Sequence, residues 1–218
     1  MRGKFITLEG GEGCGKSTQA ERLCADLQAR GIETVRTREP GGTVLGERIR
    51  SLLKDDAAVD PPCGKSEVLL FLAARAQLAE EVVIPALEAG KWVVSDRFCD
   101  STFAYQGYGR GFPLDRLRAA NEFSCGGLMP DLTLLLDVPP DVAAGRMRSR
   151  ESATGTHADR IEKAGSDFHR RIREGFLEMA AAEPERFAVI AADGTEDEVW
   201  SRISAAVAKF FPADAAVG

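Results

Sequence analysis

The chain has 218 residues, of which 44% are hydrophobic and 28% are charged. This length and composition are typical of one folded domain and exclude an intrinsically disordered chain. The 28 Lys and Arg residues are outnumbered by 34 Asp and Glu residues, which gives a net charge of −6. Because affinity for nucleic acid depends largely on neutralising phosphates, we expect no nucleic-acid partner.

The five cysteines form no CxxC pair, and no histidine stands at a metal-ligand spacing from them. This pattern excludes a zinc ribbon and argues against a secreted disulfide framework. No segment approaches the roughly 20 consecutive apolar residues that span a bilayer. The first four residues lead directly into Phe5–Glu9, a segment that is too short for the apolar region of a signal peptide. We therefore expect a cytoplasmic protein with no membrane partner.

Short apolar segments alternate with amphipathic segments along the chain. The apolar segments have the length of buried strands, and each is followed by a turn or a polar cluster; they are Phe5–Leu8, Thr34–Thr37, Trp92–Ser95, Leu132–Val138 and Phe187–Ala191. The segments between them have helical periodicity over Gln19–Arg30, Ser66–Ala89, Leu114–Phe123, Pro140–Arg148, Glu162–Ala182 and Glu196–Phe211. Pro85 predicts a kink in the longest of these helices. The alternation predicts an α/β fold with a doubly wound, five-stranded parallel sheet flanked by helices.

One segment breaks this alternation. Residues Arg150–Asp159 are small, polar and without a period. We interpret them as a mobile loop inside a single domain that comprises residues 1–218.

A phosphate-binding loop, or P-loop, follows the first predicted strand. The chain there matches the pattern G-x-x-x-x-G-K-[ST], with a strand before it and a helix after it. Glycines let backbone N–H groups converge on phosphates, and the following helix adds its positive N-terminus. Lys16 can neutralise the β- and γ-phosphates, and the Ser17 hydroxyl can ligate Mg²⁺. We assign the binding of a nucleoside triphosphate to Gly10, Gly11, Glu12, Gly13, Cys14, Gly15, Lys16, Ser17 and Thr18. The motif does not identify the acceptor of the phosphoryl group.

Three more polar clusters follow predicted strands, at the sheet edge where parallel sheets bind ligands. They contain the sequences R-E-P-G-G-T from Arg38, D-R-x-x-x-S-T-x-A-Y-Q-G from Asp96, and D-R-I-E from Asp159. In this order and beside a P-loop, these motifs make the chain similar to the bacterial thymidylate kinases over nearly its whole length. The resemblance implies a nucleoside monophosphate kinase that transfers the γ-phosphoryl group of ATP to dTMP with Mg²⁺, forms dTDP for dTTP synthesis, and assembles as a homodimer.

The resemblance also implies a thymine site. Phe71 and Arg75 are four residues apart and so share one face of a helix. Phe71 can stack on a pyrimidine, and Arg75 can donate to the O4 atom that cytosine lacks. Ser101 and Gln106 are candidates for the rest of the base edge. Without the resemblance, Phe71 would be interpreted as a core residue and Arg75 as a solvated charge.

The resemblance also implies residues that contact the sugar and the phosphate of the acceptor. Glu12 corresponds to a carboxylate that contacts the 3′-hydroxyl of the acceptor, and Tyr105 corresponds to an aromatic residue that crowds the 2′ position. Arg38 and Arg97 would bind the acceptor phosphate. Asp96 lies where a water-mediated contact with Mg²⁺ is expected.

Catalytic arginines are expected in a lid over residues 146–160. The P-loop segment 11–14 contains no basic residue, and the arginines stand instead at Arg146, Arg148, Arg150 and Arg160. This arrangement resembles the bacterial type with a basic lid. A helical face would group Arg146 with Arg150 and not with Arg148, so we expect some of these arginines to be structural. Which of them reaches the transition state is left open.

The expected chemistry needs no general base, because a phosphate monoester is already largely anionic near neutral pH. Lys16, Arg97 and the lid arginines would oppose the charge on the phosphoryl group in transfer. Two alternatives remain. One is a kinase for another nucleotide or a deoxynucleoside; the other is a P-loop switch protein, which would leave the lid arginines unexplained.

Overall fold

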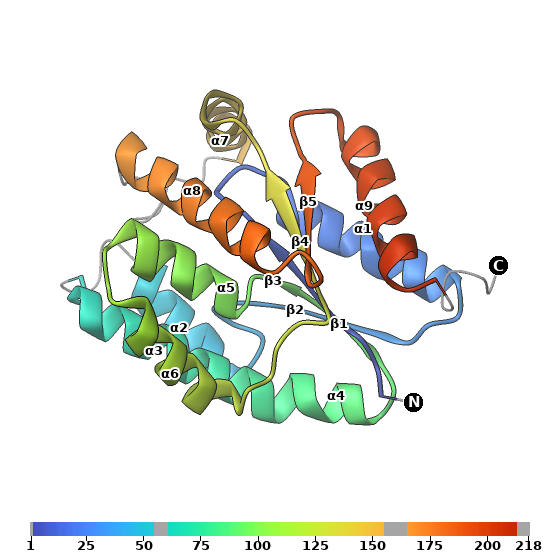
Figure 1. Cartoon of the computed structure of the whole chain (residues 1–218), viewed down its shortest axis with the longest axis horizontal. Helices are drawn as coiled ribbons and strands as arrows, with labels where there is room; N and C mark the ends of the chain where they lie inside the picture. Colours follow the sequence, from blue (N-terminus) through green and yellow to red (C-terminus); the bar gives the residue numbers. More distant parts are fainter. Residues whose placement is uncertain (1, 55–60, 155–164, 213–218) are drawn as a thin grey trace.

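The computed structural model describes residues 2–54, 61–154 and 165–212. Five parallel strands form one sheet in the order β2-β3-β1-β4-β5 (Figure 1). The strands are β1 (Phe5–Glu9), β2 (Thr34–Arg38), β3 (Trp92–Asp96), β4 (Leu132–Asp137) and β5 (Phe187–Ala191). Each begins at the residue predicted from the sequence and ends within one residue of its predicted end, so the predicted doubly wound parallel sheet is confirmed.

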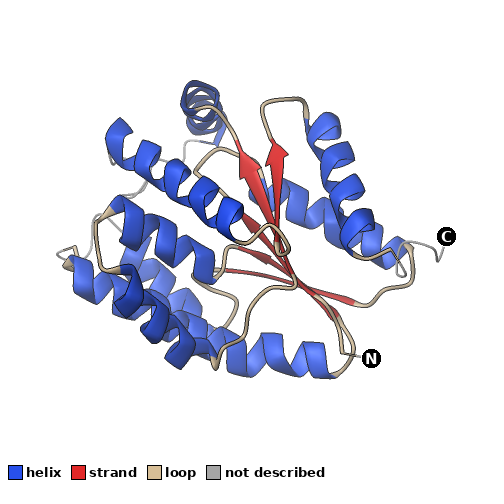
Figure 2. Ribbon diagram, in the orientation of Figure 1, coloured by secondary structure: helices blue, strands red, loops and turns tan. Residues whose placement is uncertain are grey.

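Helices cover both faces of the sheet, as Figure 2 shows. Along the chain they are α1 (Lys16–Ala29), α2 (Val44–Lys54), α3 (Gly64–Leu78), the π-helical η1 (Ala79–Val83), α4 (Ile84–Glu88), α5 (Cys99–Thr102), the π-helical η2 (Phe103–Gly109), α6 (Leu114–Cys125), α7 (Pro140–Thr154), α8 (Ser166–Ala182) and α9 (Glu196–Phe210). Among the described residues, no helix is both long and apolar enough to cross a membrane.

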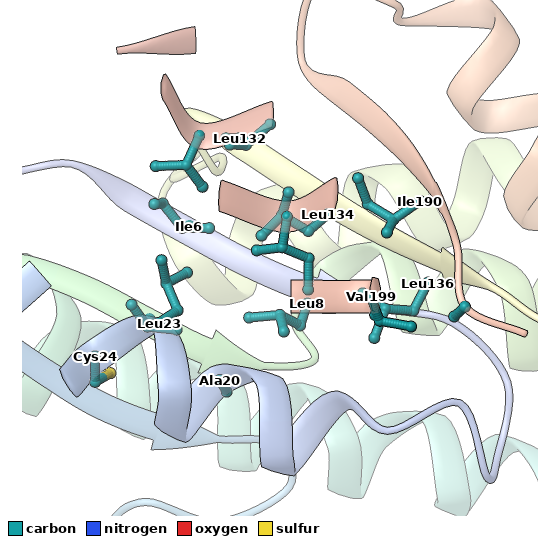
Figure 3. Close-up of a cluster of buried hydrophobic side chains, with 14 of the residues drawn as sticks. Ile6, Leu8, Ala20, Leu23, Cys24, Leu132, Leu134, Leu136, Ile190 and Val199 are labelled. Carbon is teal, nitrogen blue, oxygen red and sulfur yellow. The ribbon is translucent and has the colours of Figure 1, made fainter. Parts of the chain in front are cut away.

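Alternate residues of the central strands supply the two faces of the core. Ile6 and Leu8 of β1 point toward α1 and α9, where they pack with Leu23 and Val199 (Figure 3). Phe5, on the opposite face of the same strand, packs with residues of η1 and α4. Because successive side chains of a strand point to opposite sides, an uninterrupted apolar strand needs helices on both faces.

The long helix predicted over Ser66–Ala89 is divided in the structure. It runs as α3, widens to a π-helix over η1, and continues as α4. The predicted disturbance is therefore present, but it lies just before Pro85. Proline has no N–H to donate, so one carbonyl in the preceding turn of the helix lacks its usual hydrogen bond. The i→i+5 hydrogen bonds of a π-helical turn just before Pro85 change which carbonyl that is.

The predicted boundary between helix and loop after Arg148 is wrong. Helix α7 continues through Thr154, so the first residues of the expected loop are helical. Arginine, glutamate and alanine favour helices, but an exposed helix without an apolar stripe gives no periodic pattern. The remainder of the expected loop, residues 155–159, lies outside the described residues. The helix predicted over Glu162–Ala182 begins at Ser166 in the described part of the chain.

Candidate active site

A cavity of about 500 Å³ lies at the carboxyl ends of β1, β2 and β3. It brings together most of the residues that the sequence singled out, namely Glu12, Gly13, Gly15, Lys16, Ser17, Thr18, Arg38, Phe71, Arg75, Asp96, Arg97, Ser101, Tyr105, Gln106 and Arg146. P-loop residues thus share one cavity with the residues proposed for the acceptor.

The P-loop connects β1 to α1 through glycines in conformations that other residues rarely adopt. Gly10 has φ = 135°, and a Cβ there would lie 2.5 Å from the carbonyl oxygen of Leu136. Gly13 has φ = 70°, and a Cβ there would lie 2.7 Å from the carbonyl oxygen of Ala143. Only glycine permits this backbone and this close packing. Helix α1 begins at Lys16, so the loop faces the N-terminus of a helix, which favours anions.

Lys16 is held by the P-loop itself in this structure. Its Nζ donates to the carbonyl oxygens of Gly11 at 2.7 Å and Gly10 at 3.2 Å. The side chain is buried, with 7% of its surface exposed. Cys14 is also buried, and its thiol donates to the Gly11 carbonyl at 3.0 Å. These contacts indicate a structural role for Cys14 within the P-loop. Phosphate oxygens would replace the carbonyls as partners of Lys16.

Ser17 and Asp96 present two oxygen ligands beside the P-loop. The Ser17 hydroxyl donates to Asp96 Oδ2 at 2.5 Å, although the two residues come from α1 and β3. The described residues contain no group of three or more His, Cys, Asp and Glu side chains that could hold a metal ion. Mg²⁺ needs no such group, because it binds through one or two protein oxygens together with water and phosphates. This pair therefore fits Mg²⁺ bound with a nucleotide.

Glu12 and Arg97 form an ion pair across the cavity. Arg97 Nη2 lies 2.5 Å from Glu12 Oε1, and the Tyr105 hydroxyl donates to the same oxygen at 3.1 Å. Burial alone would raise the pKa of Glu12, but Arg97 and Lys16 lower it to about 2. Burial raises the pKa of the Tyr105 phenol well above its usual value, so this group remains a donor. Glu12 is thus a fixed negative charge in a loop suited to anions.

Arg97 has an unusual backbone. Its φ of 74° lies in the left-handed region, which residues other than glycine rarely adopt. Its guanidinium donates to the Gly10 carbonyl at 3.1 Å and to Ser101 Oγ at 3.2 Å. The arginine is thereby attached to the P-loop as well as to the chain that follows β3.

Glu9 holds the segment that follows β3 in place, and the sequence analysis did not identify it as a site residue. Its carboxylate is fully buried and accepts the backbone N–H of Phe98 at 2.7 Å and the Ser101 hydroxyl at 2.6 Å. Burial, and then the nearby Asp100, raises the pKa of Glu9 to about 7. The available signal was a carboxylate at the end of an otherwise apolar strand.

Arg75 is fully enclosed, so it is not the solvated charge that it would be taken for without the family resemblance. It donates to the carboxylate of Glu39 through Nε at 2.9 Å and through Nη2 at 2.5 Å. The remaining donors reach Thr102 Oγ1, Asn121 Oδ1 and the Phe98 carbonyl. All five N–H groups of this guanidinium have protein partners, so a contact with a base would share a donor that is already engaged. Sequence reasoning gave Glu39 no role.

The other proposed base and phosphate contacts are held less tightly. Phe71 is half-buried and packs against Ile49 of α2 while it lines the cavity. Arg38 is exposed and pairs with Glu47 at 3.0 Å. The peptide bond between Glu39 and Pro40, next to Arg38, is cis.

The structure separates two of the four lid arginines. Arg146 lines the cavity, and its guanidinium donates to the carbonyls of Ala192 at 2.7 Å and Gly194 at 2.9 Å. Arg148 is exposed and lines a separate surface depression. The expected separation of these two side chains is thus confirmed. The side chain of Arg150 and the whole of Arg160 lie outside the described residues.

The sheet order, the P-loop and a second set of anion-binding side chains facing it define a P-loop phosphotransferase that acts on a nucleotide. The thymidylate kinase family model matches residues 8–203. The thymidylate kinase of Deinococcus radiodurans is 50% identical over 208 residues, which cover 95% of this chain and 98% of that protein. The thymidylate kinase of Carboxydothermus hydrogenoformans is 47% identical over 203 residues, which cover 93% of this chain and 96% of that protein. The chain belongs to the thymidylate kinase family.

A solved structure agrees with this assignment. The crystal structure of thymidylate kinase from Ehrlichia chaffeensis superposes with a TM-score of 0.73 at 32% identity, and covers 95% of this chain and 99% of that one. The family resemblance, the fold class and the class of enzyme predicted from the sequence are therefore confirmed. The roles of individual site residues remain predictions.

Proposed function

We propose that this chain transfers the γ-phosphoryl group of ATP to the phosphate of dTMP and thereby forms dTDP. The observation that carries the proposal is that the P-loop lines the same cavity as Arg97, Phe71 and Gln106. Membership of the thymidylate kinase family supports the same reaction. The acceptor phosphate would bind at Arg97 and Arg38, next to the loop that holds the donor.

The donor half of the cavity is the P-loop with Lys16, Ser17 and Asp96. Ser17 and Asp96 would hold Mg²⁺, which when bound neutralises charge on the donor phosphates. Lys16 would leave the carbonyls of Gly10 and Gly11 and donate to phosphate oxygens in their place. The buried Lys16 would therefore have hydrogen-bond acceptors both without and with a bound nucleotide.

The acceptor half is formed by residues of α3 and of the segment after β3. Phe71 would stack on the base, and Gln106 and Ser101 would contact its edge. Tyr105 and Glu12 would lie beside the sugar, at the 2′ and 3′ positions. Arg75 would act in the same half, through its contacts with Glu39 and Phe98 as well as with the base.

Transfer would need positioning and neutralisation of charge rather than a general base. Lys16 and Arg97 would flank the phosphoryl group from the donor and the acceptor sides. Of the two lid arginines whose side chains are described, Arg146 lines the cavity and Arg148 does not, so Arg146 is favoured as the lid contribution. Closure of a lid over residues 146–160 would exclude water and suppress hydrolysis of ATP.

An acceptor panel tests this function. The purified protein is assayed with ATP and Mg²⁺ against dTMP, dUMP, dCMP, dGMP and thymidine, with formation of ADP as the signal. We expect kcat/KM to be highest for dTMP. Faster transfer to thymidine would indicate a deoxynucleoside kinase, and turnover of ATP that is independent of any acceptor would indicate a P-loop switch protein.

We further propose that the enzyme is a cytoplasmic homodimer built from one domain per chain. Helix α3 packs against both α2 and α6. These three helices carry exposed apolar side chains, namely Val44, Leu45, Leu52, Leu69, Leu114 and Phe123. The family resemblance implies a homodimer, and this exposed apolar surface is our candidate for its interface. Sedimentation analysis should give a dimer, and Phe123→Asp, at a side chain that is 93% exposed, should shift it toward the monomer. A monomeric wild-type protein would contradict this proposal.

A further inference from the structure

Behind the base edge of the cavity lies a buried carboxylate that the reaction does not use. Glu67 of α3 has no exposed surface, and Gln106 of η2 is 2% exposed. Gln106 Nε2 donates to Glu67 Oε1 at 3.0 Å. Arg110 donates to the same carboxylate through Nε at 2.7 Å and Nη2 at 2.8 Å, one bond to each oxygen. Gln106 therefore lies between a clamped carboxylate and the cavity.

This arrangement decides which end of the Gln106 amide faces the cavity. A glutamine amide can exchange its oxygen and nitrogen by turning about its last bond, so its orientation depends on its partners. An ionised carboxylate only accepts hydrogen bonds, and Arg110 donates to both oxygens of Glu67. The end of the amide that faces Glu67 must then be the NH₂ group, and the oxygen must face the other way.

The amide oxygen is open to the cavity. Gln106 lines the cavity, and no described residue donates to its Oε1 atom. The buried polar side-chain atoms left without a partner in the described part of the chain are those of Gln19 and Thr37, so Gln106 Oε1 is not sealed inside the protein. The cavity therefore presents a hydrogen-bond acceptor on a lining that also includes Phe71 and Tyr105.

We propose that Glu67 is a positioning residue that fixes Gln106 as an acceptor and so selects acceptor nucleotides whose base carries an N–H at position 3. This inference rests on the proposed function and deepens it. Thymine and uracil have a donor at N3 and can bond to Gln106 Oε1. Cytosine has a lone pair there, so two acceptors would face each other, and each would lose a partner that water had supplied. A site built to bond a donor discriminates strongly against a ligand that lacks it.

The role requires a carboxylate at position 67. Glutamine in its place has nearly the same shape, but can present either a carbonyl or an NH₂ group to Gln106. The Gln106 amide could then turn over and offer its NH₂ group to N3 of cytosine. Arg110 has a supporting role, because its two hydrogen bonds fix the Glu67 carboxylate in place and occupy both of its oxygens.

The test compares Glu67→Gln with the wild type, using dTMP, dUMP and dCMP as acceptors. The kcat/KM values for dTMP and dUMP should fall together by about tenfold, because both bases use the same N3 donor, while the value for dCMP does not fall. The dCMP/dTMP ratio should therefore rise at least about tenfold, with KM for ATP unchanged. An equal fall for all three acceptors, or no change in the ratio, would overturn the inference. The matched control is Glu178→Gln, because Glu178 is exposed and accepts a hydrogen bond from Tyr108 at 2.8 Å outside the cavity; it should leave the ratio unchanged.

A double-variant cycle tests whether Glu67 acts through Gln106. In a Gln106→Ala background, Glu67→Gln should no longer change the dCMP/dTMP ratio, whereas an undiminished change would refute the proposed route. If Glu67→Gln does not fold, Arg110→Gln replaces it and should raise the ratio in the same direction; an unchanged ratio would overturn the inference. A wild-type protein inactive on dTMP would refute the proposed function itself, while an active wild type with an unresponsive variant would refute this inference alone.

Discussion

Replacing Arg75 by methionine would leave the carboxylate of Glu39 inside the protein without its cation. The two side chains are 1% and 6% exposed, so water cannot take the place of the guanidinium without opening the structure. The substitution also removes the donors that reach Thr102, Asn121 and the Phe98 carbonyl. These groups connect α3 to the segment after β3 and to α6, so the loss affects the frame of the acceptor half.

The expected loss of stability is about 3–5 kcal/mol, the usual cost of breaking a buried ion pair by removing one partner. In a domain of this size, each kcal/mol lowers Tm by roughly 2–4 °C, so Tm should fall by about 6–20 °C. Burial raises the pKa of Glu39 even beside Arg75. Without the arginine its folded pKa would rise further above the unfolded value, so the folded variant would bind a proton more readily than the unfolded chain. The deficit should therefore shrink as the pH falls from 8 to 5.

Urea unfolding of the wild type and of Arg75→Met, at pH 8 and pH 5, measures both effects. The control is the double variant Glu39→Gln with Arg75→Met, which removes the stranded charge and should recover a large part of the loss. Arg75→Lys keeps the charge but not the planar fork, and should lie between the wild type and Arg75→Met. A loss below about 1 kcal/mol for Arg75→Met, or a double variant no more stable than it, would refute the reasoning.

Three further outcomes are expected. Lys16→Ala should lower kcat by about a thousandfold or more while calorimetry detects dTMP binding within about threefold of the wild type, because the lysine faces the donor; a parallel loss of dTMP affinity would contradict that division. Arg146→Ala should lower kcat more than Arg148→Ala does in steady-state assays, since Arg146 lines the cavity; the reverse order would move the lid contribution to the other face of α7. Glu9 has a folded pKa of about 7, above the ordinary 4.5, so its contribution to stability is present at low pH and lost as the pH rises through 7. Glu9→Gln should flatten the dependence of the urea midpoint between pH 5 and pH 8, and an unchanged slope would show that another group titrates there.

The strands and the P-loop could be predicted because their signals are local. A buried parallel strand is a short apolar run such as Trp92–Ser95, and the P-loop is a contiguous pattern between a strand and a helix. The motifs of the acceptor half were also contiguous, so most of the lining of the cavity was recognised. Helix α2 was not among the predicted helices, although Ile49 and Leu53 have helical spacing.

The partners of the recognised residues could not be predicted in the same way. Glu39 and Arg75 are 36 positions apart, and Glu9 and Ser101 are 92 positions apart. Sequence identifies a carboxylate and an arginine, but only the packed sheet decides which of several carboxylates meets which arginine. The enclosure of Arg75, and the clamp that Glu67 forms with Arg110, are therefore results of tertiary structure.

The order of the strands has a consequence for how the enzyme becomes active. Strand β1 pairs with β3 and β4, each of which follows it only after long stretches of chain, and β2 is joined to the sheet through β3. Closing such distant pairs is slow, because chain entropy is lost before any contact rewards it. Arg97 donates its backbone N–H to the Leu8 carbonyl at 3.0 Å and its guanidinium to the Gly10 carbonyl at 3.1 Å, so its position against the P-loop depends on the pairing of β1 with β3. A substitution that weakens this strand pairing should thus reduce the number of active molecules in a preparation, while each folded molecule keeps its affinity for nucleotides.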